Sequence, residues 1–173
     1  NKLYDTIHQH KNADVLTVVY NFVDALSHAK TDTEVVRELA SDDSAYRRLV
    51  KTWLEGSPLL KMLQWASKQG FTVVLTTDHG TVNVHRPSKV VGTKHLTTNL
   101  RYKTGNGMSY QSKHSFVVKD PSVIGLPKQH IADECIFALS DLFYVYPNRY
   151  NHFVQYYRNT YQHGGVSLEE LII

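Results

Sequence analysis

The segment Phe71–Gly80, with the sequence FTVVLTTDHG, decides the fold prediction. Its centre, residues 73–75 (VVL), is continuously apolar, which is typical of a strand buried on both faces. Asp78 and His79 come where this strand should end, and in open α/β sheets that edge is where ligands bind. An adjacent carboxylate and imidazole suit a divalent metal such as zinc. The alternative interpretation is a turn with an Asp-capped loop.

A second apolar segment, Val15–Asn21 (VLTVVYN), is followed by the same two residue types. Its β-branched composition predicts another buried strand. In the sequence FVDALSHAK that comes next, Asp24 and His28 are four residues apart, so one helical turn would put both on one face. Because two predicted strands each deliver an acid and a histidine, we expect both pairs to lie at the same edge of a sheet.

The other segments alternate between helical and strand-like patterns, which predicts an α/β fold. Ser57 as an N-cap and Pro58 in the first turn mark the clearest helix start. We expect helices at Asn1–Lys11, Thr33–Leu39, Ala45–Glu55, Leu59–Lys68 and Asn151–Gln162, and strands at Thr81–His85, Leu100–Thr104, His114–Lys119 and within Asp133–Tyr146.

The C-terminal sequence HGGVSLEELII combines a histidine with two glycines and a helix start. Gly164 and Gly165 permit an unusual backbone path beside His163. Ser167 and Glu170 have the spacing of a capping box, which predicts a short final helix. His163 is therefore a candidate ligand held between ordered elements, although a surface histidine has the same local sequence.

Composition narrows the classes of function. The chain has 173 residues, of which 42% are hydrophobic, so it has the size of one domain and enough apolar content for a core. A net charge of +3, with histidine neutral, is too small to indicate nucleic acid as an obligate partner. No apolar run approaches the ~18 residues of a membrane span, so we expect no membrane partner. Ten histidines supply many metal-binding groups.

The single cysteine, Cys135, rules out an internal disulfide and suits a reducing cytoplasm, where we expect the protein to reside. Its apolar neighbours predict a buried and inert thiol. The chain begins at Asn1 without an initiator methionine and enters an amphipathic pattern at once, so we expect it to be a piece of a longer protein.

A cluster of mostly positive residues occupies the middle of the chain. One interpretation is a phosphate-facing lip over the metal site, because Arg and Lys pair with phosphate oxygens. The other is an ordinary solvated loop region. The cluster comprises Arg86, Lys89, Lys94, His95, Arg101, Lys103, Lys113, His114 and Lys119.

The motifs D-x3-H, D-H-G and H-G-G-x-S-x-E-E become specific in combination. Together they resemble the alkaline phosphatase superfamily and, within it, the PglZ domain, whose pattern is similar to the phrases TTDHG and QHGGVSLEELI. The resemblance covers essentially the whole chain. It extends to the C-terminal portion of a cytoplasmic two-component response regulator associated with the type nine secretion system.

The resemblance implies an alkaline-phosphatase-like fold: a mostly parallel sheet flanked by helices, with residues 1–173 as the C-terminal part of a single PglZ domain that lacks its N-terminal strand or strands. It implies two zinc ions in the intact domain. One complete site would use Asp24, His28 and His163. The second would use Asp78 and His79 together with a carboxylate from a strand expected upstream.

The resemblance also implies a Thr or Ser nucleophile, which we expect upstream as well. Thr76, Thr77 and Thr81 are near the second site in sequence but do not match the position of that nucleophile. The sequence therefore predicts no catalytic nucleophile within this chain. We expect the chain alone to bind one zinc and to be catalytically silent, and manganese in place of zinc stays open because geometry decides between the two.

The implied function is a zinc-dependent phosphohydrolase or phosphodiesterase domain of a response regulator that controls type nine secretion. Its substrate would be a phosphodiester of nucleotide type, its partners a sensor kinase or sigma factor acting through the full-length protein, and it would form a homodimer. The alternative is a non-catalytic, zinc-stabilised regulatory or dimerisation module.

Overall fold

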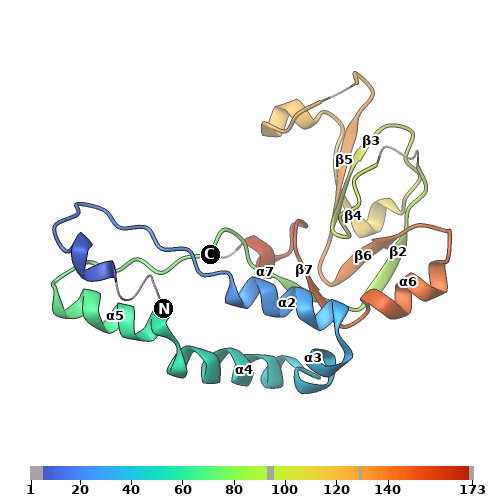
Figure 1. The fold of residues 1–173 in the computed structure, drawn as a ribbon. Helices are drawn as coiled ribbons and strands as arrows, with labels where there is room; N and C mark the ends of the chain where they lie inside the picture. Colours follow the sequence, from blue (N-terminus) through green and yellow to red (C-terminus); the bar gives the residue numbers. More distant parts are fainter. Residues whose placement is uncertain (1–5, 93–95, 129, 172–173) are drawn as a thin grey trace. The chain divides into compact units, whose positions relative to one another are not determined.

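A computed structural model describes residues 6–92, 96–128 and 130–171 (Figure 1). The chain divides into two compact units, Asn1–Thr76 and Thr77–Ile173. The first unit is helical and the second contains every strand of the described residues. No helix in those ranges has the length and apolar character needed to cross a membrane.

Helices make up most of the first unit, and their starts follow from local capping. The Asp42 side chain accepts a hydrogen bond from the Ala45 N–H at 2.7 Å, and Ser57 does the same for Leu60 at 3.3 Å with Pro58 at the first position. The helices predicted at Thr33–Leu39, Ala45–Glu55 and Leu59–Lys68 are confirmed. The unit contains the 3₁₀ helix η1 (Ile7–His10) and the helices α2 (Phe22–Asp32), α3 (Glu34–Leu39), α4 (Asp43–Gly56) and α5 (Pro58–Lys68). The rest of the helix expected at Asn1–Lys11 includes residues 1–5, which lie outside the described residues.

Aromatic packing joins the start of α2 to α4. The Phe22 ring stacks on Trp53 with the centroids 4.0 Å apart and the planes 3° apart, and Tyr20 lies against the same indole at 5.7 Å. The Tyr46 hydroxyl donates a hydrogen bond to the Val23 carbonyl at 3.1 Å. These contacts fix the first turn of α2, the helix that carries Asp24.

The two buried strands predicted in this unit are wrong. Residues 15–21 and 71–77 run as irregular chain, and Val15, Val74 and Leu75 are 82%, 80% and 77% exposed. A strand that is buried on both faces needs a hydrogen-bonded neighbour on each side. Within the described ranges neither segment pairs with a strand. Apolar continuity alone therefore did not make these segments core strands.

The second unit contains three small sheets, which confirms the α/β class. Of the four strand pairs among the described residues, one is parallel and three are antiparallel, so the sheets are small and mixed where a mostly parallel sheet was expected. Antiparallel pairing joins β1 (Val82–Val84) to β7 (Thr160–Gln162), and β5 (Glu134–Ala138) to both β3 (Tyr102–Gly105) and β4 (Ser115–Val118); β2 (Arg86–Lys89) pairs in parallel with β6 (Leu142–Val145). The remaining elements are η2 (Ser112–His114), η3 (Pro121–Ile124), α6 (Tyr150–Tyr157) and α7 (Leu168–Leu171).

The strand that is buried on both faces is β6. Leu142 and Tyr144 pack into one apolar cluster with Val90 and Ile136, and the alternate residues Phe143 and Val145 pack into a second cluster with Val82 and Val84. The second cluster is covered by aromatic residues of α6. The helix predicted at Asn151–Gln162 ends at Tyr157, and residues 160–162 form β7 instead. β6 thus stands between the two cores of this unit.

Phe143 tests the role of β6, because its ring is fully buried. We expect Phe143→Ala to lower the free energy of unfolding by about 3–5 kcal/mol, since it removes a large ring and leaves a cavity. Urea denaturation followed by circular dichroism measures the change. Phe116→Ala, at a ring that is 52% exposed, is the control and should cost much less. Equal losses in both variants would contradict this role.

Candidate metal centre

The first unit contributes one acid and one histidine. Asp24 and His28 lie one turn apart on α2, and the His28 Nε2 atom is 3.5 Å from the Asp24 Oδ1 atom. Both side chains are more than half exposed, so both are accessible to a ligand. The prediction that the four-residue spacing places them on one helix face is confirmed. A carboxylate and an imidazole at this separation can turn toward the same cation.

The second unit brings together His79 and His163, which are far apart in sequence. β1 and β7 pair antiparallel with Val82 opposite Gln162, so the residues just before β1 meet the residue just after β7. The two imidazole rings consequently stack, with centroids 3.8 Å apart and planes at 11°. His79 and Asp78 thus precede β1, and do not follow the buried strand that the sequence predicted.

The orientation of His79 suits metal binding. Its Nδ1 atom is 3.1 Å from the Gly80 carbonyl oxygen, and its Nε2 atom is 3.8 Å from Asp78 Oδ2. When Nδ1 carries the proton and its N–H donates a hydrogen bond to that carbonyl, the Nε2 lone pair is available to a cation, an arrangement common among metal-binding histidines.

Asp78 is a well-exposed carboxylate that stays ionised. Its pKa is lowered by a hydrogen bond from its own backbone N–H and then by the neighbouring His79. The Thr77 hydroxyl donates to the His79 carbonyl at 3.0 Å, so it shapes this turn. With carboxylate oxygens and imidazole nitrogens as donors, the residues of each unit fit a divalent metal such as zinc.

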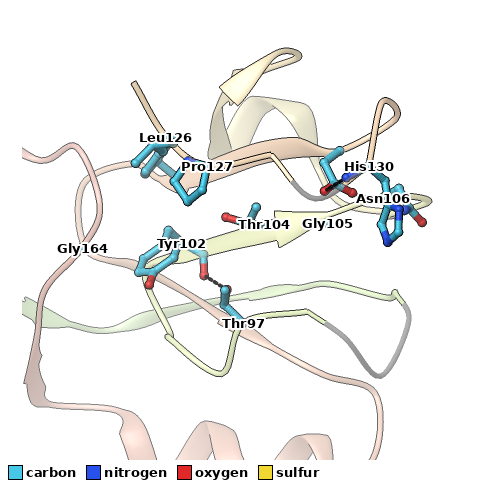
Figure 2. Close-up of a pocket in the computed structure, with 11 residues that line it drawn as sticks. Thr97, Tyr102, Thr104, Gly105, Asn106, Leu126, Pro127, His130 and Gly164 are labelled. Atoms are coloured by element: carbon cyan, nitrogen blue, oxygen red, sulfur yellow. Dashed lines mark hydrogen bonds between the residues drawn. The ribbon is translucent and has the colours of Figure 1, made fainter. Parts of the chain in front are cut away.

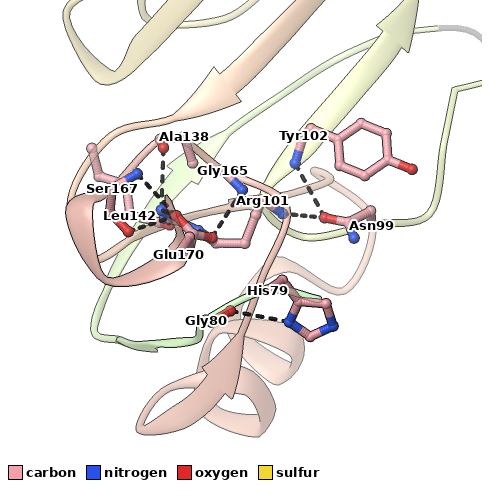
Figure 3. Close-up of polar contacts among 10 residues, drawn as sticks. All are labelled: His79, Gly80, Asn99, Arg101, Tyr102, Ala138, Leu142, Gly165, Ser167 and Glu170. Atoms are coloured by element: carbon pink, nitrogen blue, oxygen red, sulfur yellow. Dashed lines mark hydrogen bonds and ion pairs between the residues drawn. The ribbon is translucent and has the colours of Figure 1, made fainter. Parts of the chain in front are cut away.

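A buried ion pair holds the segment that follows His163, from Gly165 to Glu170 (Figure 3). The fully buried Arg101 donates to both oxygens of Glu170, from Nε at 2.8 Å and from Nη2 at 2.6 Å. Arg101 also donates to the carbonyl oxygens of Leu142 and Ala138, on β6 and β5. The guanidinium group therefore links the C-terminal segment to the strands of the unit's core.

Glu170 also confirms the predicted capping box. Its carboxylate accepts hydrogen bonds from the Ser167 N–H at 3.0 Å, from the Ser167 hydroxyl at 2.6 Å and from the Gly165 N–H at 2.8 Å. Every one of these donors lies within seven residues of His163. The pairing of this capping glutamate with Arg101 was not predictable from local sequence, because the two residues are 69 positions apart.

Two glycines are required by close approach. Gly80 donates its N–H to the Glu170 carbonyl at 3.1 Å, and a Cβ atom at Gly80 would lie 1.9 Å from the Glu169 carbonyl oxygen. At Gly165, a Cβ atom would lie within 2.8 Å of Arg101 and Glu170. The glycines of the D-H-G and H-G-G motifs thus let both histidine-bearing segments approach the ion pair (Figure 3).

The prediction that the basic residues in the middle of the chain form a surface is wrong for two of them, which are buried. Arg101 and Lys103 are 0% and 1% exposed, so neither is a surface contact for phosphate and neither is solvated. The Lys103 Nζ atom donates to the Thr97 carbonyl at 2.7 Å and lies 4.5 Å from the centre of the Tyr146 ring. Arg86 and Lys119 form ion pairs with Asp141 and Glu134, and Lys94 and His95 lie outside the described residues.

Cys135 is fully buried, as predicted, with its sulfur 3.1 Å from the Thr104 hydroxyl.

The chain matches a known protein family over almost its whole length. A family model described as the BREX system PglZ alkaline phosphatase-like domain matches residues 2–173. No curated protein matches the chain significantly.

The Arg101–Glu170 pair predicts a pH-dependent stability. Burial raises the pKa of Glu170, but hydrogen bonds from Arg101 and Ser167 outweigh it, so the pKa lies below the ordinary 4.5. The stabilisation is therefore complete above about pH 4.5 and is lost as the pH falls through the lowered folded-state value. We expect Glu170→Gln to cost about 3–5 kcal/mol at neutral pH, since it leaves Arg101 buried without its counter-charge. Denaturation curves between neutral and acidic pH measure this.

The matched control is Glu169→Gln, at an exposed neighbour. The difference in stability between the wild type and Glu170→Gln should shrink on acidification. A constant difference would show that the carboxylate charge is not what holds the segment.

The burial of Lys103 predicts that the stability of the protein changes with pH in the alkaline range. Burial lowers the pKa of Lys103 to about 8, from 10.5. Between these values the folded protein has released a proton that the unfolded chain still holds, so stability must rise with pH. Relative to Lys103→Met, the wild type should gain stability across this window in denaturation curves. Lys113→Met, at an exposed lysine, should follow the wild type. If the stability of the wild type and of Lys103→Met changed with pH in the same way, the lowered pKa of Lys103 would be contradicted.

Proposed function

Because the chain belongs to the PglZ family of alkaline phosphatase-like domains, we propose that it is the metal-binding part of a phosphohydrolase. The observation that carries the proposal is the family match over residues 2–173, which spans both compact units. A match to one domain family across the chain supports treating residues 1–173 as part of one PglZ domain, in which the donors of the two units serve one centre.

Within this centre we assign Asp24, His28 and His163 to one zinc ion, and Asp78 and His79 to a second. The 3.5 Å approach of Asp24 and His28 supports the first site, and the stacking of His79 on His163 supports two sites that adjoin each other. Such ions polarise phosphoryl oxygens. A phosphohydrolase of this type therefore uses the donors that both units present.

Interactions within the chain position the donors. The Gly80 carbonyl orients His79, the Arg101–Glu170 pair fixes the segment that follows His163, and packing of Phe22 on Trp53 fixes the helix of Asp24 and His28. Ligation requires neutral imidazoles, so acidification should release the metal. We assign no nucleophile among the residues of this chain.

The finer parts of the proposal rest on the motif resemblance. The substrate is a phosphodiester of nucleotide type, and the metal is zinc. The domain belongs to a cytoplasmic response regulator of type nine secretion, whose full-length form binds a sensor kinase or sigma factor.

A second candidate function is a non-catalytic, zinc-stabilised regulatory or dimerisation module. It is favoured by the exposed apolar side chains of Val15, Val19, Val74 and Leu75, which a homodimer would cover. Turnover separates the two functions: zinc-dependent release of nitrophenol from bis(4-nitrophenyl) phosphate supports the hydrolase, and zinc-dependent dimerisation without turnover supports the module.

Metal binding by the 173-residue chain tests the assignment directly. Calorimetric titration with zinc should detect one strong site, and His163→Ala or His28→Ala should weaken it by roughly 100-fold or more, because removing a ligand costs at least as much as removing its orienting partner. The control is His152→Ala, which changes an exposed histidine on α6. Unchanged affinity in both ligand variants would refute the site, and titration with manganese would show which ion the donors prefer.

A further inference from the structure

The second unit contains a cavity of about 580 Å³ that the metal centre does not account for (Figure 2). This volume lies in the ordinary range for a small-molecule site. The cavity is lined by Thr97, Tyr102, Thr104, Gly105, Asn106, Leu126, Pro127, His130, Asp133, Phe137 and Gly164.

One wall is the outer face of the three-stranded sheet. Tyr102 pairs with Phe137 in the ladder, and their rings lie 6.3 Å apart on the face opposite the buried Lys103 and Ile136. Leu126 and Pro127 lie on the other side of the cavity from Tyr102 (Figure 2). Two apolar side chains thus face an aromatic wall, which is the setting that a flat ring fills well.

The cavity has two chemically different ends. Tyr102 and Gly164 lie at one end, so this end adjoins His163 in the chain (Figure 2). Asn106 and His130 lie at the other end, where the buried Asp133 carboxylate accepts hydrogen bonds from the Asn106 side chain at 3.2 Å and the His130 N–H at 2.8 Å.

Charge excludes phosphate from the interior of this cavity. None of the described lining residues is Lys or Arg, and Asp133 would repel an anion. The lining therefore accepts a group without negative charge, such as a neutral ring, and an attached phosphate must lie outside, toward the end that adjoins His163.

We propose that this cavity binds a flat aromatic ring carried by the phosphate ester, with the phosphate at the Gly164 end. The proposal rests on the proposed function for the role of His163, but the ring site itself needs no metal. A nucleobase and an aryl group share this chemistry.

Ligand-observed NMR on the 173-residue chain tests the ring site with compounds that differ only in the ring. Phenylphosphonate should bind at least ~10-fold more tightly than methylphosphonate, because only the former buries an aromatic surface. Thr104→Phe, which places a ring in the cavity from the same strand face as Tyr102, should abolish this preference. Val123→Phe makes the same type of change at a residue that is 77% exposed and outside the lining, and should retain it.

Two further arms keep the test decisive. If circular dichroism shows that Thr104→Phe does not fold, Leu126→Trp fills the cavity from the opposite side. Repeating the titrations in EDTA separates the two proposals: a phenyl preference that persists without metal supports the ring site even if the hydrolase assignment fails. Comparing the binding of adenosine 5′-monophosphate with that of phenylphosphonate shows whether the cavity prefers a nucleobase or an aryl ring. Loss of binding of either compound in the cavity-filling variants supports the cavity as the ring site. Equal binding of the two phosphonates, or a preference that survives both filling variants, would overturn the proposal.

Discussion

The second unit depends on one buried ion pair, Arg101 with Glu170. Removing two charges from water is costly, and the cost is recovered only when every donor and acceptor is satisfied. Here the guanidinium reaches both carboxylate oxygens and two carbonyls, and the carboxylate also accepts from Ser167 and Gly165. The specificity of this geometry, more than its net energy, determines where the C-terminal segment lies.

That placement is what gives the histidine motifs their arrangement. β7 pairs with β1, and Gly80 donates to the Glu170 carbonyl, so the segments before β1 and after β7 are joined at both their strands and their turns. His79 and His163 stack as a consequence. The D-H-G and H-G-G motifs are therefore two sides of one structural unit. Their glycines are needed because the backbones approach too closely for a side chain.

Local features of the sequence were predictable. The Ser57–Pro58 helix start, the Ser167–Glu170 capping box and the placement of Asp24 and His28 on one helix face depend on residues at most four positions apart. The features that were missed depend on distant partners. Residues 71–77 resemble a core strand in composition, but β6 is the strand whose neighbours bury both of its faces. Likewise, nothing near Arg101 in sequence indicates that its counter-charge is Glu170, so a surface role was expected. The assignment of Asp24, His28 and His163 to one ion came from the family resemblance, because spacing alone does not show which motifs share a metal.

The central proposal is that Asp24, His28 and His163 bind one metal ion. Anomalous scattering at the zinc edge, measured from crystals grown with zinc, tests it most directly. The account predicts an ion about 2.0–2.2 Å from donor atoms of Asp24, His28 and His163. An ion bound elsewhere, with these three side chains directed to unrelated parts of the molecule, would contradict it.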